Sequence, residues 1–146
     1  MDLSDYVDLT QCIEISRFAI SKEFRRRKAD QMDDSVITDA NAGREAHLAF
    51  LSLVRFVLRQ SVRHNVLFWT AVMEPRLLRL LARLGICYTP VGPLVEYHGI
   101  RQPCHCYLPD MLENARRAQP RSWEVLTDGG VLHDQLASNI RKLAAA

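Results

Sequence analysis

The stretch that decides the fold is Cys12–Ile20, CIEISRFAI, which is followed by the basic run Arg25–Lys28. Side chains alternate between the two faces of a strand, so one face would carry Cys12, Glu14, Ser16 and Phe18 and the other Ile13, Ile15, Arg17 and Ala19. The apolar, β-branched composition predicts a central strand covered on both faces. Glu14 and Arg17 are costly to bury in such a strand without a partner or a cavity, so they indicate a functional site.

The composition is that of a single globular domain. The chain has 146 residues, of which 48% are hydrophobic and 25% charged, enough for one real core. The formal net charge of +2 and the lack of a recognised motif argue against a nucleic-acid partner. The sequence contains neither a signal peptide nor an apolar run of membrane-spanning length, so we expect a cytoplasmic protein with free thiols and no transmembrane segment.

Periodicity and chain breakers predict the elements after this strand. Apolar residues at steps of three and four predict a helix over Gly43–Asn65, apolar almost all the way round and therefore largely buried. The apolar run Val66–Val72 predicts a strand buried on both faces. Glu74-Pro75 opens a second helix that Gly85 ends, and its core-facing residues would be Leu77, Leu78, Leu80, Leu81 and Leu84.

The second half of the chain predicts further strands and short helices. A strand is expected over Ile86–Val91, and two more would flank a tight turn at His98-Gly99. Helical patterns follow over Pro109–Ala118 and Arg121–Leu143, the second with a break at Asp128–Gly130. This order predicts an α/β (α+β) layered domain with a mixed sheet flanked by helices.

Several polar residues have both a functional and a structural interpretation. Glu14 could accept a proton from an amine in a cleft, or form an ion pair at a strand end. The run Arg25–Lys28 could bind phosphate or an acidic protein, or form a solvated surface. Cys104-His105-Cys106 would place its sulfurs and its imidazole on opposite faces, and no second cluster completes four ligands, so no metal site is predicted.

Three stretches together resemble known acyltransferases. Glu14–Phe18 resembles the Glu-x-Ser-Arg-Phe strand of the acyl-homoserine-lactone autoinducer synthases. Met73–Gly85, followed by Val91–Pro93, resembles their Met-Glu-Arg helix, Arg-x-Gly stop and Leu-Gly-Pro strand. The run Gly92–Cys104 is closer to a sister group, the acyltransferases associated with PEP-CTERM/exosortase systems, which are similar to N-acyl amino acid synthases.

This resemblance implies the GNAT-like acyl-CoA N-acyltransferase fold. It implies transfer of a fatty acyl group from acyl-carrier protein, or from acyl-CoA, to a small amine such as an amino acid. The acyl-phosphopantetheine thioester would be a co-substrate, with no bound cofactor. The likeness covers Gln11–Leu126, which divides the chain into an acyltransferase domain at 1–126 and a partly helical tail at 127–146.

The resemblance also implies roles for individual residues. Glu14 would be the general base, acting directly or through water, and Arg17 would organise the site or the substrate carboxylate. The residues implied in substrate and acyl binding are Ser16, Phe18, Ser21, Phe24, Phe68, Trp69 and Thr70. Those implied in carrier-protein binding are Arg25, Arg26, Arg27 and Lys28.

One departure from the family concerns the start of the chain. Family members carry further residues ahead of the Glu-x-Ser-Arg strand, including the first strands of the sheet, so this chain resembles their C-terminal portion. We therefore expect a bare sheet edge and poor stability in isolation. The alternative hypothesis is an inactive or truncated fragment that only binds an acidic carrier or partner protein through its arginine face.

Overall fold

The computed structural model describes residues 8–16 and 40–146, with the side chains of the second range described from residue 47. The elements run in the order η2 (Leu9–Gln11), β1 (Cys12–Glu14), α2 (Ala40–Arg63), β2 (Phe68–Met73), α3 (Pro75–Arg83), β3 (Thr89–Pro90), β4 (Val95–Glu96), β5 (Ile100–Tyr107), α4 (Leu108–Ala118), α5 (Pro120–Thr127) and α6 (Val131–Ala145).

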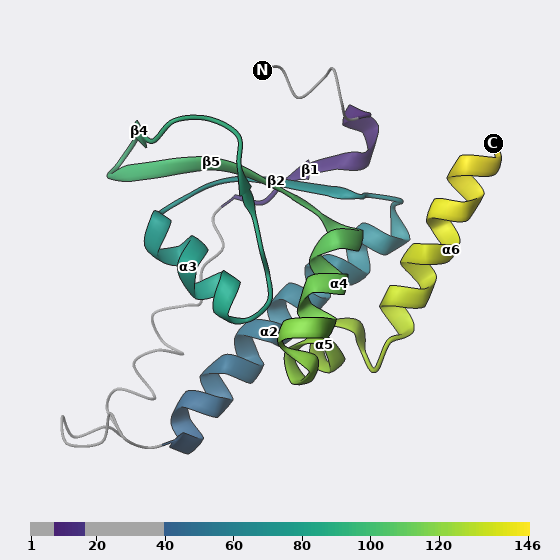
Figure 1. Cartoon of the computed structure of the whole chain (residues 1–146), viewed down its shortest axis with the longest axis horizontal. Coiled ribbons are helices and arrows are strands. Elements are labelled where there is room, and N and C mark those ends of the chain that lie inside the picture. The colour runs from purple at the N-terminus through teal and green to yellow at the C-terminus, as the bar shows by residue number, and fades with distance from the viewer. Residues whose placement is uncertain (1–7, 17–39) are drawn as a thin grey trace.

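A mixed sheet forms the centre of the fold. Its strand order is β1-β2-β5-β3, and β4 pairs with the start of β5. β1 runs parallel to β2, whereas β5 is antiparallel to β2, β3 and β4. The strands cross the upper part of Figure 1, with α2, α3, α4 and α5 below them and α6 at the right-hand side. The predicted α+β architecture, a mixed sheet flanked by helices, is confirmed.

The core lies between this sheet and α2. The buried residues of α2 recur at helical spacing and are Leu51, Val54, Leu58 and Val62. On β2, Trp69 is only 2% exposed, and its indole N–H donates to Ser61 Oγ of α2 at 2.8 Å. Trp69 is paired in register with Cys106, which is buried on the same side of the sheet. One face of the sheet and one face of α2 therefore form the core.

The expectation that α2 is buried nearly all round was wrong. Phe56 is 58% exposed and Leu48 is 49% exposed, because only one side of the helix packs on the sheet and on α5 and α6. Leu80 of α3, predicted to face the core, is likewise 50% exposed. No helix within 8–16 and 40–146 has the length and apolar character needed to cross a bilayer.

Two strands also differ from their predicted environments. Among the described residues β1 lies at the edge of the sheet, not at its centre, and Glu14 is exposed. The remainder of the predicted strand, Arg17–Ile20, lies outside the described residues. β2 buries one face, but Val72 on its other face is 50% exposed. The strand expected over Ile86–Val91 is restricted to Thr89–Pro90.

The C-terminal helices belong to the same packed unit. The predicted break is present at Asp128–Gly130, where all three residues have positive φ. The division predicted after residue 126 falls within α5. Helix α6 buries Leu132 and Leu136 in the core, and the Asn139 side-chain amide donates to the Val62 carbonyl oxygen of α2 at 2.7 Å.

Replacing Leu58 tests which face of α2 is buried. Leu58 is 0% exposed, so Leu58→Ala should lower the free energy of unfolding by about 2–5 kcal/mol. Phe56→Ala on the same helix is the matched control and should change it by about 0.5 kcal/mol or less. Urea denaturation followed by circular dichroism measures both. Equal costs for the two variants would contradict this assignment of faces.

Candidate functional site

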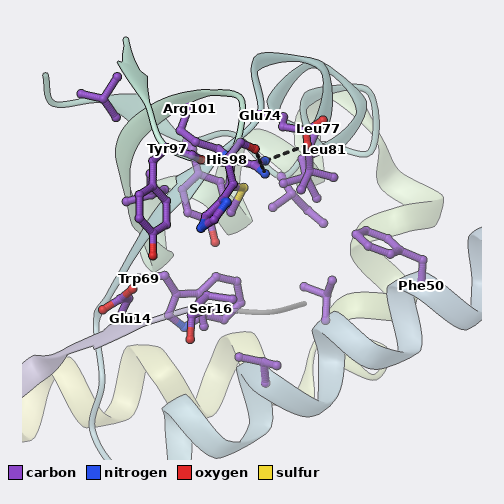
Figure 2. A pocket seen from close by; sticks show the side chains of 18 of the residues that line it. Glu14, Ser16, Phe50, Trp69, Glu74, Leu77, Leu81, Tyr97, His98 and Arg101 are labelled. Atoms are coloured by element: carbon purple, nitrogen blue, oxygen red, sulfur yellow. Dashed lines mark hydrogen bonds and ion pairs between the residues drawn. The ribbon is translucent and has the colours of Figure 1, made fainter. Parts of the chain in front are cut away.

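A pocket of about 1140 Å³ opens at one end of the sheet. Its interior is mainly apolar and is formed by side chains from α2, β2, α3 and the segment after α3, namely Phe50, Val54, Val57, Trp69, Met73, Leu77, Leu81, Ile86 and Tyr88. Its rim carries the polar groups Glu14, Ser16, Glu74, Glu96, Tyr97, His98 and Arg101. Figure 2 shows Glu14, Ser16 and Trp69 on one side of the opening, facing Tyr97 and His98 on the other.

The pocket lies where the described pairing between β1 and β2 ends. Their register ends at the pair Glu14 and Thr70, and the Ile15 N–H donates to the Thr70 carbonyl oxygen at 2.8 Å. β2 continues through Met73, but within the described residues these last positions pair with β5 alone. Since backbone direction alternates along a strand, the N–H and C=O of Val72 point the same way as those of Thr70, past the end of β1.

The β4–β5 hairpin forms one wall of the pocket. The predicted turn is confirmed: the Tyr97 N–H donates to the Gly99 carbonyl oxygen at 3.0 Å, and His98 and Gly99 both have positive φ. Arg101 holds this wall against α3. Its guanidinium donates to Glu74 Oε1 at 2.7 Å and to the carbonyl oxygens of His98 at 3.0 Å and Tyr97 at 3.3 Å.

Tyr88 lines the pocket, and its hydroxyl lies near the buried thiols of Cys104 and Cys106. Burial raises the pKa of Cys104 to about 11. Burial, reinforced by neighbouring thiols and Asp110, also raises the pKa of Cys106. The pKa of the Tyr88 hydroxyl is raised by burial and by the same two thiols. All three groups therefore stay neutral near pH 7, which disfavours Cys104 or Cys106 as a thiolate nucleophile.

The structure gathers only part of the predicted site. Glu14, Ser16 and Trp69 line the pocket. Phe68 and Thr70 are not among its lining residues. They share the less buried face of β2 with Val72, which does reach the pocket, and the Phe68 ring lies 4.8 Å from the Tyr107 ring. The other predicted residues lie outside the described ones: Arg17, Phe18, Ser21, Phe24, Arg25, Arg26, Arg27 and Lys28.

Sequence reasoning missed most of the lining. The hairpin wall of Glu96, Tyr97, His98 and Arg101 was predicted as a turn and as part of the family-like run Gly92–Cys104, but not as part of the site. The interior wall from α2 carried a usable signal: Phe50, Val54 and Val57 recur at steps of four and three beside the core stripe. A helix with two adjacent apolar stripes lines a cavity or a second interface when only one stripe packs in the core.

The Cys104-His105-Cys106 segment has the alternation predicted from sequence. Cys104 and Cys106 are buried on the core face, whereas His105 lies in register with Thr70 on the other face. The three side chains therefore cannot close around one ion. No group of three or more His, Cys, Asp or Glu residues gathers around a potential metal position in the described part of the chain.

Comparison of the chain with protein-family models, curated proteins and solved structures found no match.

Thiol labelling tests the environment of β5. Cys87 is exposed, whereas Cys104 and Cys106 are buried. With a pKa of about 11, Cys104 is ionised to only about one part in a thousand at pH 8. Cys87 should react rapidly with a chromogenic disulfide reagent, and the two buried thiols only after unfolding in urea. The Cys87→Ser variant is the control, and rapid labelling of its β5 thiols would contradict this packing.

Proposed function

We propose that this protein is an N-acyltransferase that moves a fatty acyl group from a phosphopantetheine thioester to a small amine. The observation that carries the proposal is a large apolar pocket with a carboxylate, Glu14, at its mouth. Its volume of about 1140 Å³ lies just above the usual range for small-molecule sites, about 300–1,000 Å³. The motifs that resemble the acyltransferases of the autoinducer-synthase and PEP-CTERM-associated groups support the same reaction and a GNAT-like fold.

The apolar interior suits the acyl chain. Residues from α2 and α3 line it, with Val57 and Leu77 among them, and no ion pair is formed inside it among the described residues. Each methylene moved from water into such an environment contributes about 0.8 kcal/mol. The thioester would enter the pocket where the described pairing of β1 with β2 ends. The acyl-carrier protein would remain outside the pocket. The predicted contacts at Arg25–Lys28 lie outside the described residues.

The mouth suits the chemistry of amine attack. The Glu14 carboxylate is exposed, so it can take one proton from the nitrogen of a neutral amine, directly or through one water, as the C–N bond forms. The nitrogen lone pair attacks the thioester carbonyl carbon, the C–N bond forms, and the oxygen becomes an oxyanion. Collapse breaks the C–S bond, and the leaving thiolate takes up the proton.

Backbone groups are available for the oxyanion. The Val72 N–H points to the side of β2 on which β1 ends. Val72 lies two residues after Thr70, the ladder partner of Glu14. Backbone N–H groups over Ser16–Ile20 are further candidate donors, and only Ser16 of these is described. Donors aimed at the developing charge in a site with little water contribute strongly to the rate of acyl transfer.

Glu14→Gln tests the reaction directly. Loss of the proton acceptor should reduce acyl transfer by about 100-fold or more, while the unfolding midpoint stays unchanged because the side chain is exposed. Purified protein is assayed with acyl-carrier and acyl-CoA donors and a panel of amines, with products identified by mass spectrometry. Glu124→Gln, an exposed carboxylate on α5, is the matched control.

Two outcomes would contradict the proposal. Full activity of Glu14→Gln would remove the general base from the mechanism. A parent protein that binds the acyl-carrier protein but transfers no acyl group would favour the alternative, a non-catalytic binding module.

Val57→Phe tests whether the acyl chain occupies the interior. The larger side chain would fill part of the pocket wall on α2, so transfer of long acyl chains should fall by about tenfold relative to short ones. Blocking space for two methylenes costs about 1.6 kcal/mol. Leu53→Phe, on the same helix but not a lining residue, should leave the chain-length ratio unchanged. An unaltered ratio in Val57→Phe would place the acyl chain elsewhere.

A further inference from the structure

The exposed apolar side chains of this protein are concentrated at one end. Eleven large hydrophobic residues are substantially exposed in the described part of the chain, and six of them come from the segment between β2 and β5: Val72, Leu80, Leu94, Val95, Tyr97 and Ile100. Tyr97 is 67% exposed and Leu94 is 56% exposed. The other five are scattered over η2, α2 and α6. Monomeric proteins rarely gather large apolar side chains in this way without a function.

These residues surround the mouth of the pocket. Val72, Val95 and Tyr97 line it directly, and Ile100 is paired in register with Glu96 across the hairpin. In Figure 1 the β4–β5 hairpin is at the left-hand end of the molecule, with α3 below it and α5 and α6 away from it. We call this region, formed by the hairpin Leu94–Arg101 and helix α3, the hairpin end.

The hairpin end also carries unpaired positive charge. Arg76, Arg79 and Arg83 are exposed on one side of α3, with Leu80 between them, and none of these arginines forms an ion pair with another described residue. Two carboxylates lie nearby. Glu74 is neutralised by Arg101 at 2.7 Å, and Glu96 accepts the Gly99 N–H at 3.0 Å. Among the described residues, the three arginines therefore outnumber the free acids of this surface.

We propose that the hairpin end docks on an anionic lipid bilayer. Exposed aliphatic and tyrosine side chains beside arginines are the combination that favours binding in the headgroup region. The hairpin is a narrow projection with a β4 strand of two residues. Such a tip can insert among lipids, whereas a stable protein interface needs about 800 Å² from each partner. This argument favours a bilayer over a protein partner.

Docking in this orientation places the pocket mouth at the lipid surface. An apolar ligand can then pass between the bilayer and the pocket interior without crossing water. The bilayer contact goes beyond the proposed acyl transfer and does not depend on it, because membrane binding is measured without any reaction.

Vesicle co-sedimentation of the full chain tests the proposal. The protein should sediment with vesicles of phosphatidylcholine and phosphatidylglycerol, and much less with phosphatidylcholine alone. Leu94→Ser/Tyr97→Ser/Ile100→Ser should abolish binding. Arg76→Gln/Arg79→Gln/Arg83→Gln should weaken it by about fivefold for each arginine at low salt, and added salt should weaken binding of the parent similarly.

The matched control is Phe56→Ser/Val131→Ser, which removes two exposed apolar side chains far from the hairpin, at 58% and 51% exposure. It should bind vesicles as the parent does, and circular dichroism checks that every variant is folded. Three results would overturn the proposal: no sedimentation of the parent, equal loss in the control, or a parent oligomer that the hairpin variant converts to a monomer. The last result would make the hairpin end a protein interface.

Discussion

The site depends on where the described pairing of β1 with β2 ends. Parallel pairing holds the two strands together as far as the Ile15 N–H and the Thr70 carbonyl oxygen, at 2.8 Å. β2 continues beyond that point because β5 pairs with it through Met73. Within the described residues, Val72 has no ladder partner on the β1 side. The pocket, the Glu14 carboxylate and the Val72 backbone N–H lie together at this end of the described pairing.

Helix α2 supplies both the core and the pocket wall. Leu51 and Leu58 are almost fully buried against the sheet, whereas Phe50 and Val57 line the pocket. Val54 takes part in both. The two stripes explain why so much of the helix is apolar. They also mean that the core packing of α2 sets the position of the wall against which an acyl chain would lie.

Local chemistry made much of the fold predictable. Pro75 and Gly85 delimit α3. Gly85 adopts a φ of +83°, and a β-carbon at this position would lie 2.9 Å from the Ala115 α-carbon, so a side chain here would be strained. The breaks at Asp128–Gly130 and His98-Gly99 follow from the same tolerance of positive φ. Which face of an element meets solvent was less predictable. The exposure of Phe56 and Leu80 depends on neighbours distant in sequence, which periodicity does not specify.

The candidate site was only partly predictable for a related reason. Glu14 could be predicted as a site residue because a carboxylate is unusual in an apolar strand, and the neighbouring sequence alone is enough to show this. Arg101 and Glu74 are 27 residues apart in sequence, and neither segment contains a local pattern that predicts their contact. The interior lining is formed by ordinary apolar residues, whose composition does not distinguish a filled core from an open pocket.

The hairpin is the least firmly held wall of this site. A two-residue strand contributes few ladder hydrogen bonds, and the Arg101–Glu74 pair is partly exposed, with side-chain accessibilities of 24% and 56%. Such a pair contributes about 0–1 kcal/mol. The two additional bonds from Arg101 to hairpin carbonyl oxygens therefore matter more, because they fix the turn from the side facing α3. Regions with few buried contacts open at low free-energy cost. The walls formed by α2 and β2 belong to the core, so on their side a change in the width of the mouth must come chiefly from movement of the hairpin.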